Sequence, residues 1–171
     1  LVKRGVTRQQ IAGGGSTMTQ QLAKQIFSPT EDNVMERLLQ IPIEWVIGVQ
    51  LERYYTKEEI LTMYLNKFDF LNNAVGIKTA ANTYFSKEPK DLNIEEAATL
   101  VGMCKNPSLN NPKRFNERSR GRRNVVLDQM RKAGYLTDAE ADSLKALPLV
   151  LKYRRVDHKE GLATYFREYL R

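Results

Sequence analysis

Gly13-Gly14-Gly15-Ser16-Thr17-Met18-Thr19-Gln20-Gln21-Leu22-Ala23-Lys24 joins a glycine turn to the start of a helix. Glycines let the backbone approach a ligand closely, Ser16 is well suited to cap the helix, and the free amides of a first helical turn attract negative charge. Polar residues at i, i+3, i+4 and i+7 then share one helical face: Thr17, Gln20, Gln21 and Lys24. The stretch predicts an anion-binding site, although a capped helix after a loose loop has the same spacing.

Hydrophobic periodicity along the rest of the chain predicts a mainly α fold with little or no β structure. Capping-box spacing, in Thr56 with Glu59 and in Thr137 with Glu140, predicts helices that start near residues 57 and 138. Pro42 is expected to kink the long apolar helix that contains it or to reset its start. The other helices are predicted over residues 17–27, 34–55, 74–85, 94–103, 119–133 and 162–170.

The composition is that of one ordinary globular domain, with 171 residues of which 42% are hydrophobic and 27% charged. The net charge of +7 suits an anionic partner, which a phospholipid surface, a pyrophosphate-linked substrate or nucleic acid would each satisfy. The single cysteine, Cys104, excludes an intrachain disulfide and a metal site built from cysteines, and the single histidine, His158, disfavours histidine-based triads. The longest apolar stretch, Leu38 to Leu51, is shorter than the roughly 20 residues that span a bilayer.

The glycine stretch resembles the second motif of the family 51 glycosyltransferases, the peptidoglycan polymerase domain of class A penicillin-binding proteins. Further segments resemble the same family in the same order, as far as about residue 136. They are Thr56 to Asn66, Gly76-Ile77, Ala80-Ala81, Tyr84-Phe85, Glu96-Ala97-Ala98, Asn106-Pro107-Ser108, Asn111-Pro112 and Arg123 to Leu127. Because these motifs agree in their order, the resemblance is far more specific than any one of them.

This resemblance implies a lysozyme-like helical fold, in which residues 1–155 form a partial glycosyltransferase domain and residues 156–171 begin a linker toward a transpeptidase domain. It implies polymerisation of lipid-linked disaccharide-pentapeptide into growing glycan strands, with release of undecaprenyl pyrophosphate. The implied location is the external or periplasmic face of the cell membrane, within a larger anchored protein. The family requires no cofactor, although a divalent cation such as Mg²⁺ often assists near the pyrophosphate, and no metal ligands are predicted in this chain.

The resemblance also implies roles for particular residues. Glu44 corresponds to the second acidic residue of the family, which assists the reaction without serving as the principal base. Gln40 and Ile41 stand where the family has basic residues, so Arg37 is the predicted replacement cation. The full predicted substrate-binding set is Gly14, Gly15, Ser16, Thr17, Gln20, Gln21, Lys24, Arg37, Asn66 and Gly76. For Asn66 and Gly76, a structural role is an equally good interpretation.

The first motif of the family, an acidic string that supplies the main catalytic base, has no counterpart in Leu1 to Ala12, which contain neither Asp nor Glu. These 171 residues alone are therefore expected not to polymerise lipid-linked disaccharide at an appreciable rate.

Glu44 is also distinctive on physical grounds, because it is the only charged residue between Arg37 and Glu52 and has Ile43 and Trp45 as neighbours. An unpaired carboxylate among apolar groups is costly unless it meets a cation or a polar cleft, so Glu44 is predicted to line a site. The alternative is an exposed glutamate on the one wet edge of a buried helix. Lys24 can reach a phosphate at the start of its helix, and a solvated lysine is the corresponding alternative.

Two other functions fit the sequence less well. The first is a noncatalytic module that binds lipid pyrophosphate or a partner protein through the same cleft. The second is a basic nucleic-acid binder, which is disfavoured because the aromatic residues are not interleaved with the arginines as stacking platforms require. We therefore predict no nucleic-acid partner.

Overall fold

The structure is a computed structural model that describes residues 18–27 and 34–154, with the side chains of 34–39 outside the description. These residues form seven α-helices, a short 3-10 helix and no strand beyond one bridge between Asp69 and Val75, which confirms a mainly α fold. The helices are α2 (Met18–Phe27), α3 (Val34–Tyr54), α4 (Lys57–Lys67), α5 (Ile77–Phe85), η1 (Pro89–Asp91), α6 (Ile94–Met103), α7 (Asn116–Lys132) and α8 (Asp138–Ala146).

The chain divides into two compact units, the first ending at Lys67 and the second beginning at Phe68. The single domain expected from the composition stays a prediction, because two compact units can belong to one domain. The division arises because the contacts between helices concentrate within α2 to α4 and again within α5 to α8.

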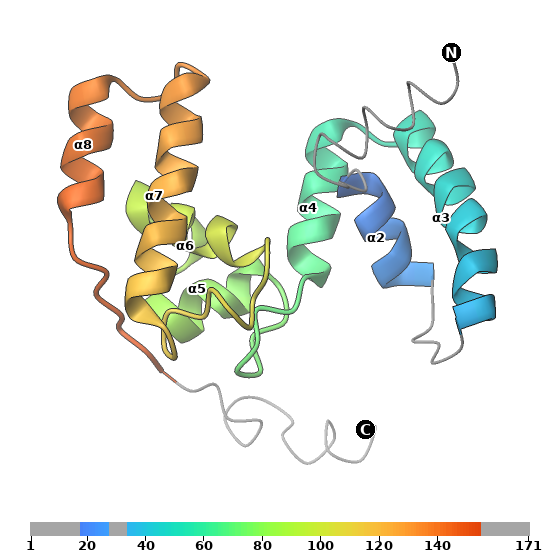
Figure 1. Ribbon diagram of the computed structural model, residues 1–171, viewed down its shortest axis with the longest axis horizontal. Coiled ribbons are helices and arrows are strands. Elements are labelled where there is room, and N and C mark those ends of the chain that lie inside the picture. The colour runs from blue at the N-terminus through green and yellow to red at the C-terminus, as the bar shows by residue number, and fades with distance from the viewer. Residues whose placement is uncertain (1–17, 28–33, 155–171) are drawn as a thin grey trace. The chain divides into compact units, whose positions relative to one another are not determined.

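In the first unit, α2 lies between α3 and α4 (Figure 1). Leu22 and Ala23 of α2 are fully buried, and α4 contributes the buried side chains of Ile60 and Tyr64 to the same unit. The Tyr64 hydroxyl also donates a hydrogen bond of 3.2 Å to Oε1 of Gln21. A helix of 10 residues is marginal by itself in water, so these neighbours hold α2 in place.

Several helix limits agree with the sequence. The predicted starts at Lys57 and Asp138 are confirmed, and the helix over residues 94–103 is found with the predicted bounds. Of the two effects predicted for Pro42, a reset helix start is wrong, because α3 runs through it from Val34 to Tyr54 as one helix, and a kink at Pro42 stays a prediction. The predicted helix over residues 162–170 lies outside the described residues.

A left-handed turn delays the start of α5 to residue 77, three residues later than predicted. Leu71, Asn72 and Asn73 have φ angles of 64°, 55° and 63°, which a right-handed helix cannot contain. The Phe70 amide donates to the Ala74 carbonyl, and the amide of residue 76 donates to the carbonyl of residue 68, each at 2.9 Å. The turn therefore satisfies its own backbone groups.

Within the second unit, Tyr84 joins this turn to α5. Its buried hydroxyl donates a hydrogen bond of 2.7 Å to the Phe70 carbonyl and accepts bonds from the side-chain amides of Asn72 and Asn111, at 2.9 and 3.4 Å. Burial raises the pKa of Tyr84 to about 12, so the phenol stays protonated and keeps its donor at neutral pH.

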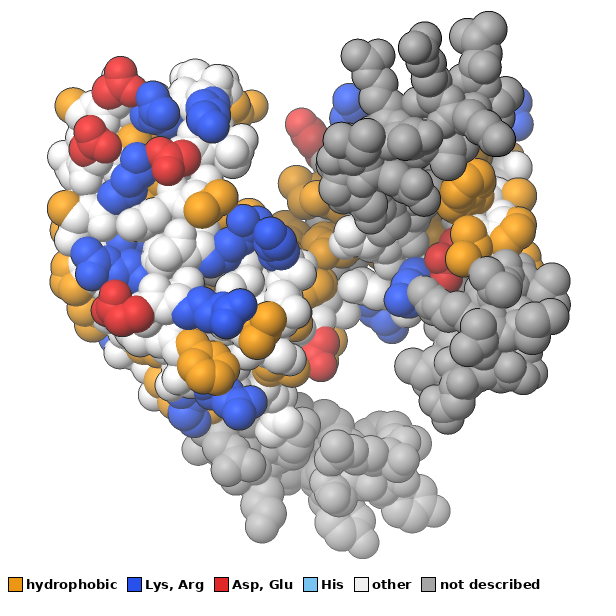
Figure 2. Space-filling model, viewed as in Figure 1, with side chains coloured by type: hydrophobic (Ala, Val, Ile, Leu, Met, Phe, Trp, Pro, Cys, Tyr) orange, Lys and Arg blue, Asp and Glu red, His pale blue; other side chains and the backbone are white. Residues whose placement is uncertain are grey.

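The core of the second unit joins α6, α7 and α8 through Ala98, Leu127, Leu136 and Ala141. Figure 2 shows Lys and Arg side chains gathered on the viewed face of this unit. A basic run in the sequence favours a solvated helix face, and it consists of Lys113, Arg114, Arg118, Arg120, Arg122 and Arg123. That interpretation is wrong for Arg123, which is fully buried.

Arg123 is buried because its guanidinium holds the chain that leaves α8. Its Nη2 donates hydrogen bonds to the carbonyls of Lys145 and Leu147, at 3.1 and 2.8 Å, and its Nε donates to Oδ1 of Asn124 at 3.2 Å. Carbonyls at the end of a helix have no partner within the helix, so an arginine that supplies donors there can be buried without a carboxylate.

The capping box at the start of α8 yields a first prediction. The Thr137 hydroxyl accepts the Glu140 amide at 3.3 Å, and the Thr137 amide donates to the Glu140 carboxylate at 2.8 Å. Thr137→Ala is expected to lower the free energy of unfolding by about 1 kcal/mol, because the Glu140 amide loses its acceptor and the Glu140 carboxylate loses the hydroxyl donor. Urea denaturation followed by circular dichroism measures this change, and Thr137→Ser should keep most of the stability. Equal stability of the alanine and serine variants would contradict the role of the box.

Cys104 yields a second prediction, concerning its reactivity as a function of pH. Desolvation by burial raises the pKa of the Cys104 thiol to about 12, so the reactive thiolate is scarce below that pH. At pH 8 its reaction with Ellman's reagent should be roughly a thousandfold slower than that of a free cysteine, and the rate should rise about tenfold per pH unit above pH 8. The urea-unfolded chain is the control, since it should react at the ordinary rate. A native rate equal to the unfolded rate would contradict burial of the thiol.

Candidate active site

Two contacts fix the register of α2 along α3. The Thr19 hydroxyl donates a hydrogen bond of 2.8 Å to Oε1 of Glu52, and a Cβ placed on Gly48 would lie 3.7 Å from Cγ of Gln20. Positions along α3 therefore fall as positions along α2 rise, as in two antiparallel helices. Continued by one further turn, this register predicts that Lys24 lies level with Glu44.

Glu44 is buried, with 8% of its surface exposed, on the same side of α3 as the buried Gly48 one turn later. The alternative of a solvated glutamate on a wet helix edge is therefore wrong. Its neighbours in the sequence, Ile43 and Trp45, are exposed to solvent over 58% and 60% of their surface. The amphipathic order of this part of α3 is thus inverted: the carboxylate turns toward the interior of the first unit and the large apolar side chains turn outward.

Lys24 is exposed on α2 and forms no ion pair or hydrogen bond with any described residue. Its ammonium group is therefore exposed for an anionic ligand, but a solvated lysine has the same surroundings, so the binding role of Lys24 stays a prediction.

The two glutamines of the motif contact different helices. Gln20 lies against α3 at Gly48, whereas Gln21 accepts the hydroxyl of Tyr64 on α4. Both side chains therefore take part in fixing α2 between its neighbours, in addition to any contact with a substrate.

Asn66 and Gly76 fall in different units. Asn66 is exposed in the last turn of α4. Gly76 precedes α5 with a φ of 84°, a left-handed conformation that favours glycine, and its carbonyl accepts the amide of Ala80 at 3.0 Å. The structural role of Gly76 is thus evident from its backbone.

The remaining predicted residues are not described in full. Gly14, Gly15, Ser16 and Thr17 lie outside the described residues, and so does the side chain of Arg37, which belongs to α3. The glycine turn and the replacement cation stay predictions.

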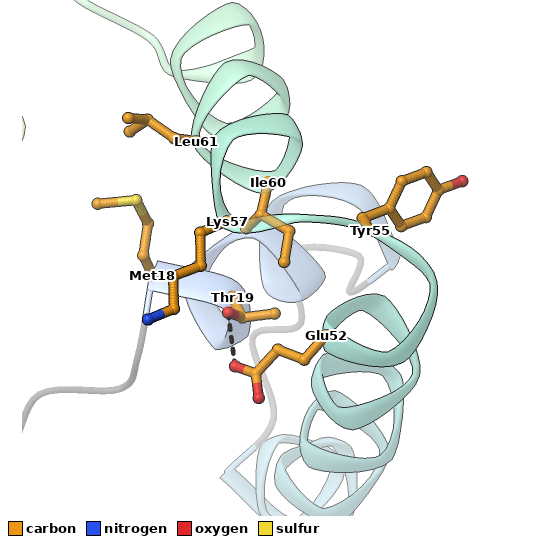
Figure 3. A pocket seen from close by; sticks show the side chains of 7 residues that line it. All are labelled: Met18, Thr19, Glu52, Tyr55, Lys57, Ile60 and Leu61. Atoms are coloured by element: carbon orange, nitrogen blue, oxygen red, sulfur yellow. Dashed lines mark hydrogen bonds between the residues drawn. The ribbon is translucent and has the colours of Figure 1, made fainter.

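A pocket of about 560 Å³ opens beside the first turn of α2. Figure 3 shows its lining, in which the carboxylate of Glu52, the hydroxyl of Thr19 and the ammonium of Lys57 accompany mostly apolar walls. The other lining residues are Met18, Tyr55, Ile60 and Leu61. Sequence reasoning did not single out Thr19, Glu52 or Lys57 as site residues, although Thr19 lies within the glycine motif and Glu52 follows Glu44 by eight positions on the same helix.

The described part of the chain offers no group of three or more His, Cys, Asp or Glu side chains that could hold a metal ion. Within the same residues, no helix combines the length and the apolar character needed to cross a bilayer.

The first unit is a helical unit with a buried carboxylate on α3 and an exposed lysine on the neighbouring α2, and such a cation suits an anionic ligand. Comparison with known families identifies the class of protein. The transglycosylase family matches residues 2–131 of this sequence, and the chain belongs to that family.

Its relatives carry the names of penicillin-binding proteins. Penicillin-binding protein 1A of Vibrio cholerae is 42% identical over 140 residues, which are 82% of this chain and 16% of that protein. Penicillin-binding protein 1F of Bacillus subtilis is 35% identical over 168 residues, which are 96% of this chain and 23% of that protein. The chain thus spans less than a quarter of the length of either relative.

A solved structure supports the same fold. The crystal structure of penicillin-binding protein 1A from Haemophilus influenzae matches 91% of this chain and 19% of its own chain, at 29% identity and a TM-score of 0.54. The predicted fold class, a mainly α lysozyme-like transglycosylase domain, is confirmed by this match together with the helices of the two units.

Proposed function

We propose that this chain is part of a peptidoglycan glycosyltransferase, which polymerises lipid-linked disaccharide-pentapeptide into glycan strands and releases undecaprenyl pyrophosphate. The observations that best support this are the burial of Glu44 on α3 and the exposure of Lys24 on α2, which packs against α3. Family membership adds the reaction class.

In this reaction the 4-hydroxyl of one lipid-linked disaccharide attacks the anomeric carbon of the growing glycan, and the pyrophosphate leaves with inversion at that carbon. The hydroxyl proton must pass to a base, and the negative charge that grows on the leaving group must be stabilised. We assign the second task to Lys24 and to the amides at the start of α2, because a lysine and a helix N-terminus both favour a phosphate. Glu44 assists, and the principal base is not assigned among these residues.

The partners follow from this reaction. They are the lipid-linked disaccharide-pentapeptide, the growing strand and the external or periplasmic membrane surface, which the chain reaches through the anchor of a larger protein. We propose that the reaction needs no resident cofactor and that a divalent cation, where one takes part, accompanies the pyrophosphate. A noncatalytic module with the same cleft is the less favoured function, because the family match covers residues 2–131.

A binding assay tests the proposal. The only tryptophan, Trp45, adjoins Glu44 and is exposed, so its fluorescence should report farnesyl pyrophosphate, a soluble analogue of the lipid donor. We expect a saturable change with farnesyl pyrophosphate that farnesol does not produce and duplex DNA does not reverse. Displacement by duplex DNA, or an equal response to farnesol, would contradict a pyrophosphate site.

Chain extension gives a third prediction. Because Leu1 to Ala12 contain no carboxylate, the 171 residues should bind the analogue and yet form no glycan polymer from radiolabelled lipid-linked disaccharide. Polymer formation that Glu44→Gln abolishes would contradict this expectation and would make Glu44 the principal base.

A further inference from the structure

Glu52 contacts the first turn of α2 through Thr19. Thr19 is the second residue of α2 and is buried, with 6% of its surface exposed. Its hydroxyl donates to Oε1 of Glu52 at 2.8 Å, across 33 positions of sequence. Glu52 itself is exposed, and no other hydrogen bond or ion pair of its carboxylate exists within the described residues.

The first turn of α2 needs such an anchor. It is the end of a short helix, where amides lack partners within the helix and where helices fray. It contains no acidic residue of its own that would stabilise it by interaction with the helix dipole. A hydrogen bond to an ionised carboxylate is roughly twice as strong as one between neutral groups, so Glu52 supplies both an anchor and a compensating charge.

The anchor lies on the helix that carries Glu44. Glu52 follows Glu44 by two turns of α3, with Gly48 between them against Gln20. The contact at Gly48 fixes the distance between the two helices, whereas a directional hydrogen bond also fixes rotation and sliding of one helix along the other. The two contacts therefore hold the first-turn amides of α2 in a fixed position relative to Glu44 of α3.

We propose that Glu52 is a positioning residue, which acts through Thr19 to hold the first turn of α2, and hence its amides, where they meet the pyrophosphate. This inference rests on the proposed function, since it concerns the same anionic group. Glu52 touches no reacting atom in this scheme. Its carboxylate also tends to repel an anion, so its contribution comes from geometry and is opposed by its charge.

The effect of the hydrogen-bond geometry and the effect of the Glu52 charge can be separated by substitution. Glu52→Gln keeps an acceptor for Thr19 and removes the negative charge, whereas Glu52→Ala removes both. Thr19→Val removes the hydroxyl at nearly constant volume, and Thr19→Ser restores it. Glu58, an exposed acid in the first turn of α4, is the matched control, because Glu58→Ala changes the net charge by the same amount without touching Thr19.

The experiment measures the dissociation constant of farnesyl pyrophosphate for the 171-residue chain by Trp45 fluorescence, well below the melting temperature of each variant. Thr19→Val and Glu52→Ala are each expected to weaken binding about tenfold, and the double variant by about the same factor instead of about a hundredfold, because both changes remove one bond. Thr19→Ser and Glu58→Ala should bind within about twofold of the wild type, and Glu52→Gln at least as tightly as the wild type.

The outcomes separate this inference from the function on which it rests. Wild-type affinity in Thr19→Val and Glu52→Ala, even with lower melting temperatures, would show a merely structural bond and overturn the positioning role. If the double variant lost affinity by the product of the two single losses, the positioning role would also be overturned. A wild-type chain that fails to bind farnesyl pyrophosphate would instead overturn the proposed function, and this inference with it.

Discussion

Lys24→Met is expected to weaken the binding of farnesyl pyrophosphate about thirtyfold, since a hydrogen-bonded charge contributes roughly 2 kcal/mol. The side chain is exposed and pairs with no described residue, so its removal leaves no buried group without a partner. The melting temperature should therefore stay unchanged while the dissociation constant rises. Titration of Trp45 fluorescence measures the constant, and thermal denaturation measures the stability.

Lys67→Met is the matched control for Lys24. Lys67 is an exposed lysine in the last turn of α4, in the same unit, and its replacement changes the net charge by the same amount. It should change binding less than about twofold, because exposed charges at a distance are screened. Equal losses in the two variants would mean that the overall positive charge attracts the analogue, and the site at the start of α2 would then be wrongly placed.

Arg123→Met is expected to lower the free energy of unfolding by about 3 kcal/mol or more, the largest effect on stability that we predict. The methionine fills similar space but leaves the carbonyls of Lys145 and Leu147 without the donor that they now share. Lysine should not rescue the loss, because a compact ammonium cannot reproduce the donor geometry of a guanidinium.

Urea denaturation followed by circular dichroism tests the role of Arg123. Arg118→Met, an exposed arginine in the same helix without an ion pair among the described residues, is the control and should change the stability by less than about 0.5 kcal/mol. Similar small losses in both variants would show that water replaces the guanidinium at the end of α8.

Local patterns in the sequence predicted the features that depend on neighbouring residues. The capping boxes located the starts of α4 and α8. The apolar surroundings of Glu44 predicted that it lines a site instead of standing on a wet helix edge, and its side chain is buried. Each of these follows from rules that act over a few residues, such as the partner needs of helix-end amides and the cost of an isolated charge.

Features that depend on distant residues were not predictable in this way. The bond between Thr19 and Glu52 depends on the register of two helices, and the burial of Arg123 depends on where the chain leaves α8. The division after Lys67 depends on how contacts are distributed over the whole chain, whereas composition reports only total size.

The turn before α5 limits how this protein can vary. Its backbone bonds join positions at fixed intervals, and Tyr84 fastens one carbonyl within it. Insertion or deletion of a single amino acid would shift the register, so that these backbone groups would no longer face their hydrogen-bond partners. Exchange of one side chain for another would leave the backbone groups paired. Across evolution, the number of residues in this turn should therefore be preserved more strictly than their identities.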